Sequence, residues 1–350
     1  MIATSKPTRL DSKFLREMKA QRRSPLCFLG IFFLLCLVPL VVRGDYYLHV
    51  LIAIYYHVIY AATYRFILRT GQFHFGAHAF IGIGAYASVL LVMRLGFLFW
   101  VAMPAAGVIA AFFALLIGFP TLRLKGVYFA IITWGFGDTL RFLYIRFKEP
   151  FGGPLGIFSI PEPNPIPVPW IGSIDFSHKT HYYFLALALM VFTLYVLHRM
   201  ERSRFGLIFG AIRERDQLAK AVGVNIMNYK VLAFAICSGL AAMGGSFYAH
   251  YTYYISPLDF TVLLTIYLAI YTVVGGQSRY SGAIVGTVVL MLVGEIFAGY
   301  AHYQLLLYSG FLILVLLFLP AGLVSLPAMF ASRFGAFRTK KGETLEHGAA

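Results

Sequence analysis

The sequence predicts an all-α integral membrane protein whose helices cross the bilayer about ten times. Of its 350 residues, 60% are hydrophobic and only 12% are charged. A soluble domain would need far more charge on its surface. Uncharged runs recur along the chain, and about 20 apolar residues are enough for one helical crossing.

We expect eight to ten crossings. The third overlaps the glycine-rich stretch from Gly71 to Gly84, and close helix packing explains most of the glycines there. The alternative for this stretch is a broken or re-entrant helix lining a cavity, where irregular backbone is tolerated. The ten expected crossings are residues 26–42, 46–64, 74–93, 97–119, 126–145, 181–198, 231–250, 260–275, 282–299 and 303–319.

Basic residues are distributed unevenly across this topology. Most of the 29 Lys and Arg residues fall at the two termini and in every second loop. The positive-inside rule places that side in the cytoplasm, so the net charge of +15 reflects topology and not nucleic acid binding. The predicted organisation is a basic cytoplasmic leader (1–25), a membrane domain (26–323) with an outer loop (148–180) and an inner loop (199–230), and a cytoplasmic tail (324–350).

The outer loop is rich in proline between Pro150 and Pro169. Proline disfavours helix and favours extended polyproline geometry, so we expect a stiff extended segment without helix. Such a segment serves either as a spacer between crossings or as part of a platform for an external partner.

The inner loop contains an amphipathic stretch from Gly206 to Val224. Apolar residues recur there at helical spacing, and charged residues such as Arg213 and Glu214 take the other side. One interpretation is a helix resting on lipid headgroups. The other is a docking helix that receives force from a motor protein, and composition favours neither.

Signatures of enzymes are missing from the sequence. It contains no G-x-x-x-x-G-K-[ST], G-x-S-x-G or H-E-x-x-H motif. We therefore expect no catalytic residue, no cofactor and no metal site, and any ATPase must be another chain. His74 and His78 lie four apart and could share a helical face as metal ligands, but without a third ligand a hydrogen-bonded pair is favoured.

Charged residues inside the crossings are a second indication of function. A charge at the centre of a bilayer costs about 2.5–3.5 kcal/mol on insertion scales. Asp138 and Arg141 are three residues apart and are expected to pair along one helical face. The pair is either structural or a gate in a pathway, and Glu295 in the ninth crossing is equally open.

Several motifs, taken in their order and spacing, resemble the membrane permease subunits of ABC importers for branched-chain amino acids. The resemblance extends from about Gly71 to Leu323. The motifs are A-F-I-G-I-G-A-Y at Ala79 to Tyr86, L-R-L-K-G-V-Y-F-A-I-I-T at Leu122 to Thr133, G-G-P-L-G at Gly152 to Gly156, S-R-F-G at Ser203 to Gly206, A-I-R-E at Ala211 to Glu214, and I-S-P at Ile255 to Pro257.

This resemblance implies a multi-pass permease of the bacterial inner membrane that carries branched-chain or related amino acids, with ATP hydrolysed on separate subunits. The implied partners are a second homologous permease subunit, two cytoplasmic ATP-binding subunits, a periplasmic solute-binding protein and the lipid membrane, but no nucleic acid. Coupling to the ATPase is expected at Ala211, Arg213, Glu214, Ala219 and Gly223, and the pathway or gate at Gly76, His78, Gly82, Gly84, Asp138, Arg141 and Glu295.

The sequence also departs from the family pattern. Ala77 stands where the family places His or Gln, and Asp138 stands where it usually has Glu. Urea, amides or another amino acid therefore remain alternative solutes. A gradient-driven secondary transporter is a further alternative, and it would need Asp138 and Glu295 as its coupling charges.

Overall fold

The structure is a computed structural model. It describes residues 34–39, 44–124, 126–168, 172–214, 225–277, 280–300, 303–319 and 322–325. Residues 1–50 and 51–350 form two separate units. In the first unit, residues 34–39 are helical and residue 45 begins α3 (Asp45–Arg69). The candidate functional site lies entirely within the second unit.

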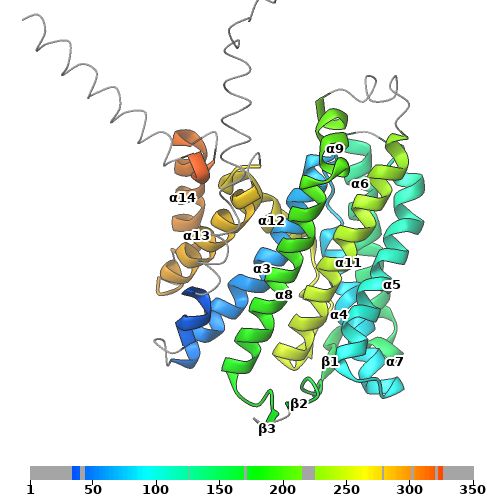
Figure 1. The fold of residues 1–350 in the computed structure, drawn as a ribbon, viewed down its shortest axis with the longest axis vertical. Coiled ribbons are helices and arrows are strands. Elements are labelled where there is room, and N and C mark those ends of the chain that lie inside the picture. The colour runs from blue at the N-terminus through cyan, green and yellow to red at the C-terminus, as the bar shows by residue number, and fades with distance from the viewer. Residues whose placement is uncertain are drawn as a thin grey trace, which may run out of the picture. The chain divides into compact units, whose positions relative to one another are not determined.

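The second unit consists mainly of long apolar helices (Figure 1). Among the described residues, six helices are long and apolar enough to cross a membrane, which confirms the predicted all-α membrane architecture. The finer prediction of eight to ten crossings stays a prediction. The six are α3, α4 (Ala77–Leu95), α5 (Phe99–Thr121), α8 (Lys179–Arg202), α11 (Ile226–Thr252) and α13 (Tyr280–Ala298); α6 (Val127–Arg146), α12 (Val262–Gly275) and α14 (Gln304–Phe318) are further helices of the described part.

Helix α11 forms the centre of the packing and lies against both α4 and α5. Glycine permits the close approach of α4 and α11. A Cβ added at Gly84 would lie 2.1 Å from the carbonyl oxygen of Ala242, and one at Gly245 would lie 2.1 Å from that of Ile81. Small residues let helix backbones approach in this way, so Gly84 is a packing residue, as the first interpretation of the glycine stretch predicted.

Charged residues of the bundle cluster near its two ends. The basic end holds Arg65 and Arg69 at the close of α3, Glu201 at the close of α8, and helix α9 (Arg204–Glu214). At the opposite end, Arg94 forms an exposed ion pair with Glu149. In Figure 1, α9 lies at one end of the bundle and α7, which begins at Lys148, lies at the other.

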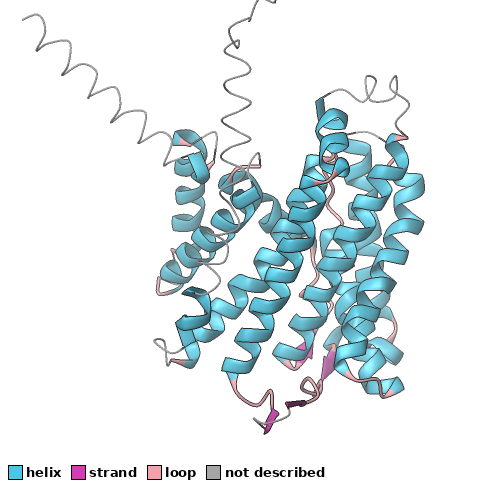
Figure 2. Ribbon diagram, viewed as in Figure 1, coloured by secondary structure: helices cyan, strands magenta, loops and turns pink. Residues whose placement is uncertain are grey.

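The outer loop is folded more regularly than predicted. It contains a helical turn, α7 (Lys148–Phe151), and a 3-10 turn, η1 (Gly153–Leu155). Glu149 within α7 has non-helical backbone torsions (φ −102°, ψ 124°), so the helical structure of the loop is confined to single turns, which proline tolerates. Two antiparallel pairs follow, β1 (Ile157–Phe158) with β4 (Tyr254–Ile255) and β2 (Ile166–Val168) with β3 (Gly172–Ile174), drawn in magenta in Figure 2.

Candidate functional site

Two helices begin inside the bundle, each after a non-helical segment. Residues 70–76 lead into α4, and residues 253–261, which include β4, lead into α12. The first residue of α4, Ala77, lines the same cavity as Ser238 of α11. Ser238 lies about 18 Å from the start of α11, at about 1.5 Å per residue. Helix α4 therefore begins near the middle of α11 and not at its end. We call residues 70–76 and 253–261 the two re-entrant segments.

The N-terminal turns of α4 and α12 meet at His78 and Thr265. The backbone N–H of His78 donates to the Thr265 hydroxyl at 3.0 Å, and the His78 Nδ1 lies 3.0 Å from the same oxygen. Helix N-termini carry unsatisfied N–H groups and a partial positive charge. Paired helix breaks of this kind form substrate sites in several transporter folds.

Helix α6 completes this junction with small residues. The Thr133 hydroxyl accepts the N–H of Phe75 at 3.1 Å, and a Cβ at Gly76 would lie 2.7 Å from the Thr133 carbonyl oxygen. A Cβ at Gly137 would lie 2.2 Å from Nε2 of His78. The His78 side chain is fully buried, and its Nε2 has no hydrogen-bond partner among the described residues. We call His78, Thr133, Gly137 and Thr265 the midpoint site.

The other predicted pathway residues lie around this site to different degrees. Asp138 follows Gly137, and its Oδ1 lies 3.0 Å from Nε of Arg141, which confirms the predicted ion pair. Gly82 faces the ring of Phe260, because a Cβ added at Gly82 would lie 3.2 Å from Cγ of Phe260. Glu295 lies elsewhere, exposed on α13, which packs against α12 and α14.

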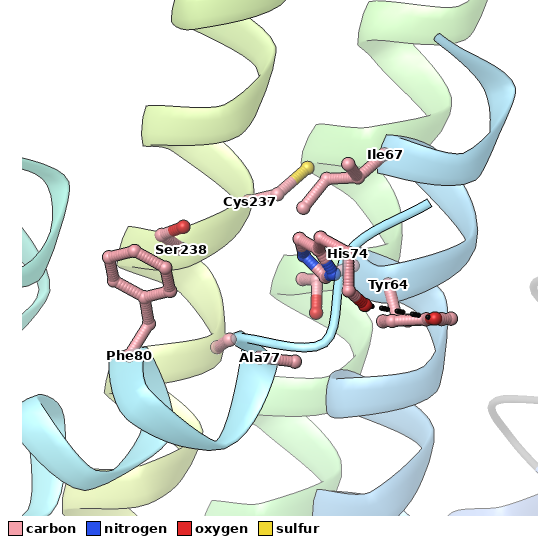
Figure 3. Close-up of a pocket in the computed structure, with 9 residues that line it drawn as sticks. Tyr64, Ile67, His74, Ala77, Phe80, Cys237 and Ser238 are labelled. Atoms are coloured by element: carbon pink, nitrogen blue, oxygen red, sulfur yellow. Dashed lines mark hydrogen bonds between the residues drawn. The ribbon is translucent and has the colours of Figure 1, made fainter. Parts of the chain in front are cut away.

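A small cavity adjoins the first re-entrant segment, as Figure 3 shows. Its volume of about 10 Å³ corresponds to about one water molecule. The Tyr64 hydroxyl donates to the His74 carbonyl oxygen at 3.2 Å. His74 Nδ1 and Ser238 Oγ, which are buried, have no hydrogen-bond partner in the described part of the chain.

His74 lies in the re-entrant segment and not in α4. The helical face that His74 and His78 could have shared as metal ligands is therefore absent, because the chain is non-helical from residue 70 to Gly76. Within the described ranges, no three His, Cys, Asp or Glu residues are grouped closely enough to hold a metal ion.

An ion cluster lies at the basic end. The Glu201 carboxylate accepts Arg65 Nη1 at 2.6 Å and lies 3.0 Å from Arg69 Nη1. Only 2% of the Arg65 side chain is exposed, and its guanidinium lies 5.5 Å from the ring centre of Tyr280 in α13. Removing one partner of a buried ion pair costs about 3–5 kcal/mol, because the other charge stays buried.

Helix α9 is the described part of the predicted docking helix. Phe209 and Ile212 are buried, with Phe209 against Phe66 of α3, whereas Leu207 and Ala211 are exposed. The backbone of residues 213 and 214 is helical. Ala219 and Gly223, the other two predicted coupling residues, lie outside the described residues.

Sequence reasoning missed Thr133, Thr265, Arg65 and Glu201. Thr133 is the last residue of the Leu122 to Thr133 motif but was not singled out within it, and Thr265 is an ordinary member of an apolar helix that no motif distinguishes. A signal for the ion cluster was present, because Arg65 and Arg69 are four apart at one helix end and so share a face.

Comparison with known proteins agrees with this architecture. Residues 46–320 match the family described as "Branched-chain amino acid transport system / permease component". No solved structure matches the chain.

Individual relatives are named for two kinds of solute. The chain is 30% identical over 278 residues to the "High-affinity branched-chain amino acid transport system permease protein LivM" of Salmonella typhimurium and that of Escherichia coli, which covers 73% of this chain and 64% of each relative. It is 26% identical over 193 residues to the "Nucleoside ABC transporter permease protein NupC" of Lactococcus lactis, covering 52% of this chain and 59% of the relative. The chain thus spans about 64% of the length of the LivM relatives. By its match over most of its length, the chain belongs to the family of branched-chain amino acid transport system permease components.

Proposed function

We propose that this chain is a permease subunit of an ATP-binding cassette importer and forms part of the pathway for branched-chain amino acids across the bacterial inner membrane. The observation that carries the proposal is the family match over residues 46–320. Its proposed partners are a second permease subunit, two ATP-binding subunits in the cytoplasm and a periplasmic solute-binding protein. The basic end then faces the cytoplasm.

The midpoint site suits a zwitterionic solute with an aliphatic side chain. The N-termini of α4 and α12 present partial positive charge to a carboxylate. A desolvated zwitterion needs such partners, because an unpaired charge in an apolar environment is costly. Aromatic residues of the neighbouring turns, such as Phe80 of α4 and Phe260 beside Gly82, suit the side chain.

Transport by reconstituted protein tests this function. The chain is co-expressed with its partner subunits, reconstituted in liposomes and supplied with binding protein and labelled leucine. We expect uptake that requires ATP and is unaffected by a protonophore. Uptake that persists without ATP and stops with the protonophore would instead indicate a gradient-driven transporter.

Competition in the same assay identifies the class of solute. Unlabelled isoleucine and valine should displace labelled leucine. The second candidate is a nucleoside, because the Lactococcus lactis relative is named as a nucleoside permease. Competition by uridine, with none by isoleucine, would replace the amino acid with a nucleoside.

Substitutions in α9 test its proposed role in docking the ATP-binding subunits. Replacing Arg213 and Glu214 together by Ala should abolish uptake while ATP hydrolysis by the assembled subunits continues. The reason is that movement of the ATP-binding subunits is no longer transmitted through α9 to the membrane helices. The matched control is Arg94→Ala with Glu149→Ala, an exposed pair at the opposite end. Normal uptake in the α9 variant would contradict the docking role.

A further inference from the structure

We propose that Glu201 is a positioning residue that ties the movement of α9 to the first re-entrant segment, residues 70–76, and through it to the start of α4. The proposal rests on the proposed function and deepens it. It assigns the connection between the docking helix and the midpoint site to the ion cluster of Glu201, Arg65 and Arg69.

The first step is the tight junction between α8 and α9. Only Ser203 separates the two helices. Its hydroxyl accepts the N–H of Phe205 at 3.3 Å, and its carbonyl oxygen accepts the N–H of Gly206 at 3.1 Å. A Cβ at Gly206 would lie 1.9 Å from the carbonyl oxygen of Glu201. Because the backbone is closely packed at the junction of α8 and α9, a displacement of α9 also displaces Glu201.

The second step leads from Glu201 to the end of α3. Both carboxylate oxygens are engaged, Oε1 by Arg65 and Oε2 by Arg69. The two arginines are one helical turn apart, so a carboxylate held by both fixes α8 against the last turn of α3. Arg69 is the final residue of α3, and the re-entrant segment begins at the next residue.

The third step leads along the re-entrant segment to the midpoint site. Tyr64, which precedes Arg65 in α3, donates to the His74 carbonyl oxygen at 3.2 Å. Phe75 N–H donates to Thr133, and His78 follows three residues later. The segment has no helical ladder of hydrogen bonds, so its backbone torsions change at lower cost than those of the helices around it.

Hydrogen exchange tests the connection without requiring transport. The full-length chain, assembled with its partner subunits in nanodiscs, is compared with Glu201→Gln, which keeps the shape and removes the charge. We expect amide exchange in residues 70–76 to accelerate about tenfold, with exchange in α5 unchanged. The matched control, Glu149→Gln, should leave residues 70–76 unchanged, since that side chain is 80% exposed at the opposite end.

A second variant guards against simple loss of folding. Arg69 is 31% exposed, so Arg69→Gln should produce a smaller acceleration in the same segment. Unchanged exchange in residues 70–76 of both variants would overturn the proposal. Equal acceleration throughout all helices would also overturn it, because that pattern indicates general destabilisation.

Uptake and ATP hydrolysis, measured on the same samples, separate coupling from stability. Glu201→Gln should lower uptake about tenfold while ATP hydrolysis stays within about twofold, and Glu201→Asp should recover part of the uptake. Parallel losses of uptake, hydrolysis and melting temperature would indicate a structural role. If the unmodified complex shows no ATP-dependent uptake, the proposed function fails, whereas hydrogen exchange still decides the role of Glu201.

Discussion

Gly137 in α6 offers a sharp test of the midpoint site. A Cβ at this position would lie 2.2 Å from Nε2 and 2.5 Å from Cε1 of His78. His78 is fully buried and is held on its other side by Thr265. The imidazole therefore cannot yield without breaking its contact with Thr265. We expect Gly137→Ala to disturb the junction of α4 and α12 with a single added methyl group.

The expected magnitude follows from three terms. Overpacking a buried site costs about 1–3 kcal/mol, and the weakened hydrogen bond to Thr265 costs about 0.5–1.5 kcal/mol. Alanine in place of glycine gains about 0.8–1.0 kcal/mol of helix propensity. The net effect of Gly137→Ala is a loss of about 0.5–3.7 kcal/mol, which lowers the melting temperature by several degrees.

Gly135 provides the matched control on the same helix. A Cβ there meets no described atom within 4 Å, so Gly135→Ala should leave the melting temperature unchanged or raise it. Both variants are measured by thermal unfolding of the purified chain and by leucine uptake. Gly137→Ala should reduce both quantities, and the double variant Gly137→Ala with His78→Ala should recover part of the lost stability because the clashing ring is gone. The reasoning is refuted if Gly137→Ala behaves like Gly135→Ala.

Two further predictions concern the same helices. Thr265→Val leaves the His78 N–H unpaired and should cost about 1–3 kcal/mol in thermal unfolding, whereas Thr265→Ser should retain most of the stability; equal losses in both would exclude the hydroxyl as the cause. Gly84→Leu places a side chain 2.1 Å from the Ala242 carbonyl oxygen and should abolish the monodisperse peak in size-exclusion chromatography. Gly210→Leu is its control, since no described atom lies within 4 Å of a Cβ there; a normal peak for both would contradict the close packing of α4 on α11.

Features that depend on local periodicity could be predicted from the sequence. The apolar runs gave the membrane helices, because one helical crossing needs a fixed length of apolar chain. The spacing of Asp138 and Arg141 gave their ion pair, because residues three apart share a helical face. The amphipathic pattern after Gly206 gave the described part of α9 for the same reason.

The midpoint site could be predicted only in part. Gly76 and His78 were candidates through the resemblance to the permease family, but Thr265 lies 187 residues from His78 and no local pattern connects them. Both interpretations of the glycine-rich stretch apply to part of it. Gly82 and Gly84 lie in the continuous helix α4, where each leaves room for a neighbouring element, whereas residues 70–76 are non-helical.

The pairing within the ion cluster also could not be predicted from the sequence. Arg65 and Glu201 are 136 residues apart, and each follows a long apolar run at the basic end. Their positions in sequence are compatible with solvent-exposed charges, which is the ordinary place for a charge. In the fold, Glu201 of α8 and Tyr280 of α13 both lie against Arg65, and the Arg65 side chain is only 2% exposed.

The two re-entrant segments are held from opposite ends of the bundle. Residues 70–76 follow the last turn of α3, where Arg65 and Arg69 form ion pairs with Glu201 at the basic end. Residues 253–261 are held at the opposite end, where Ile157 of β1 pairs with Ile255 of β4. His78 and Thr265 lie just beyond the inner ends of these two segments, so their contact depends on both anchors at once. We therefore expect this site to respond to displacement at either end of the bundle, which is the property that alternating access requires of a fixed central site.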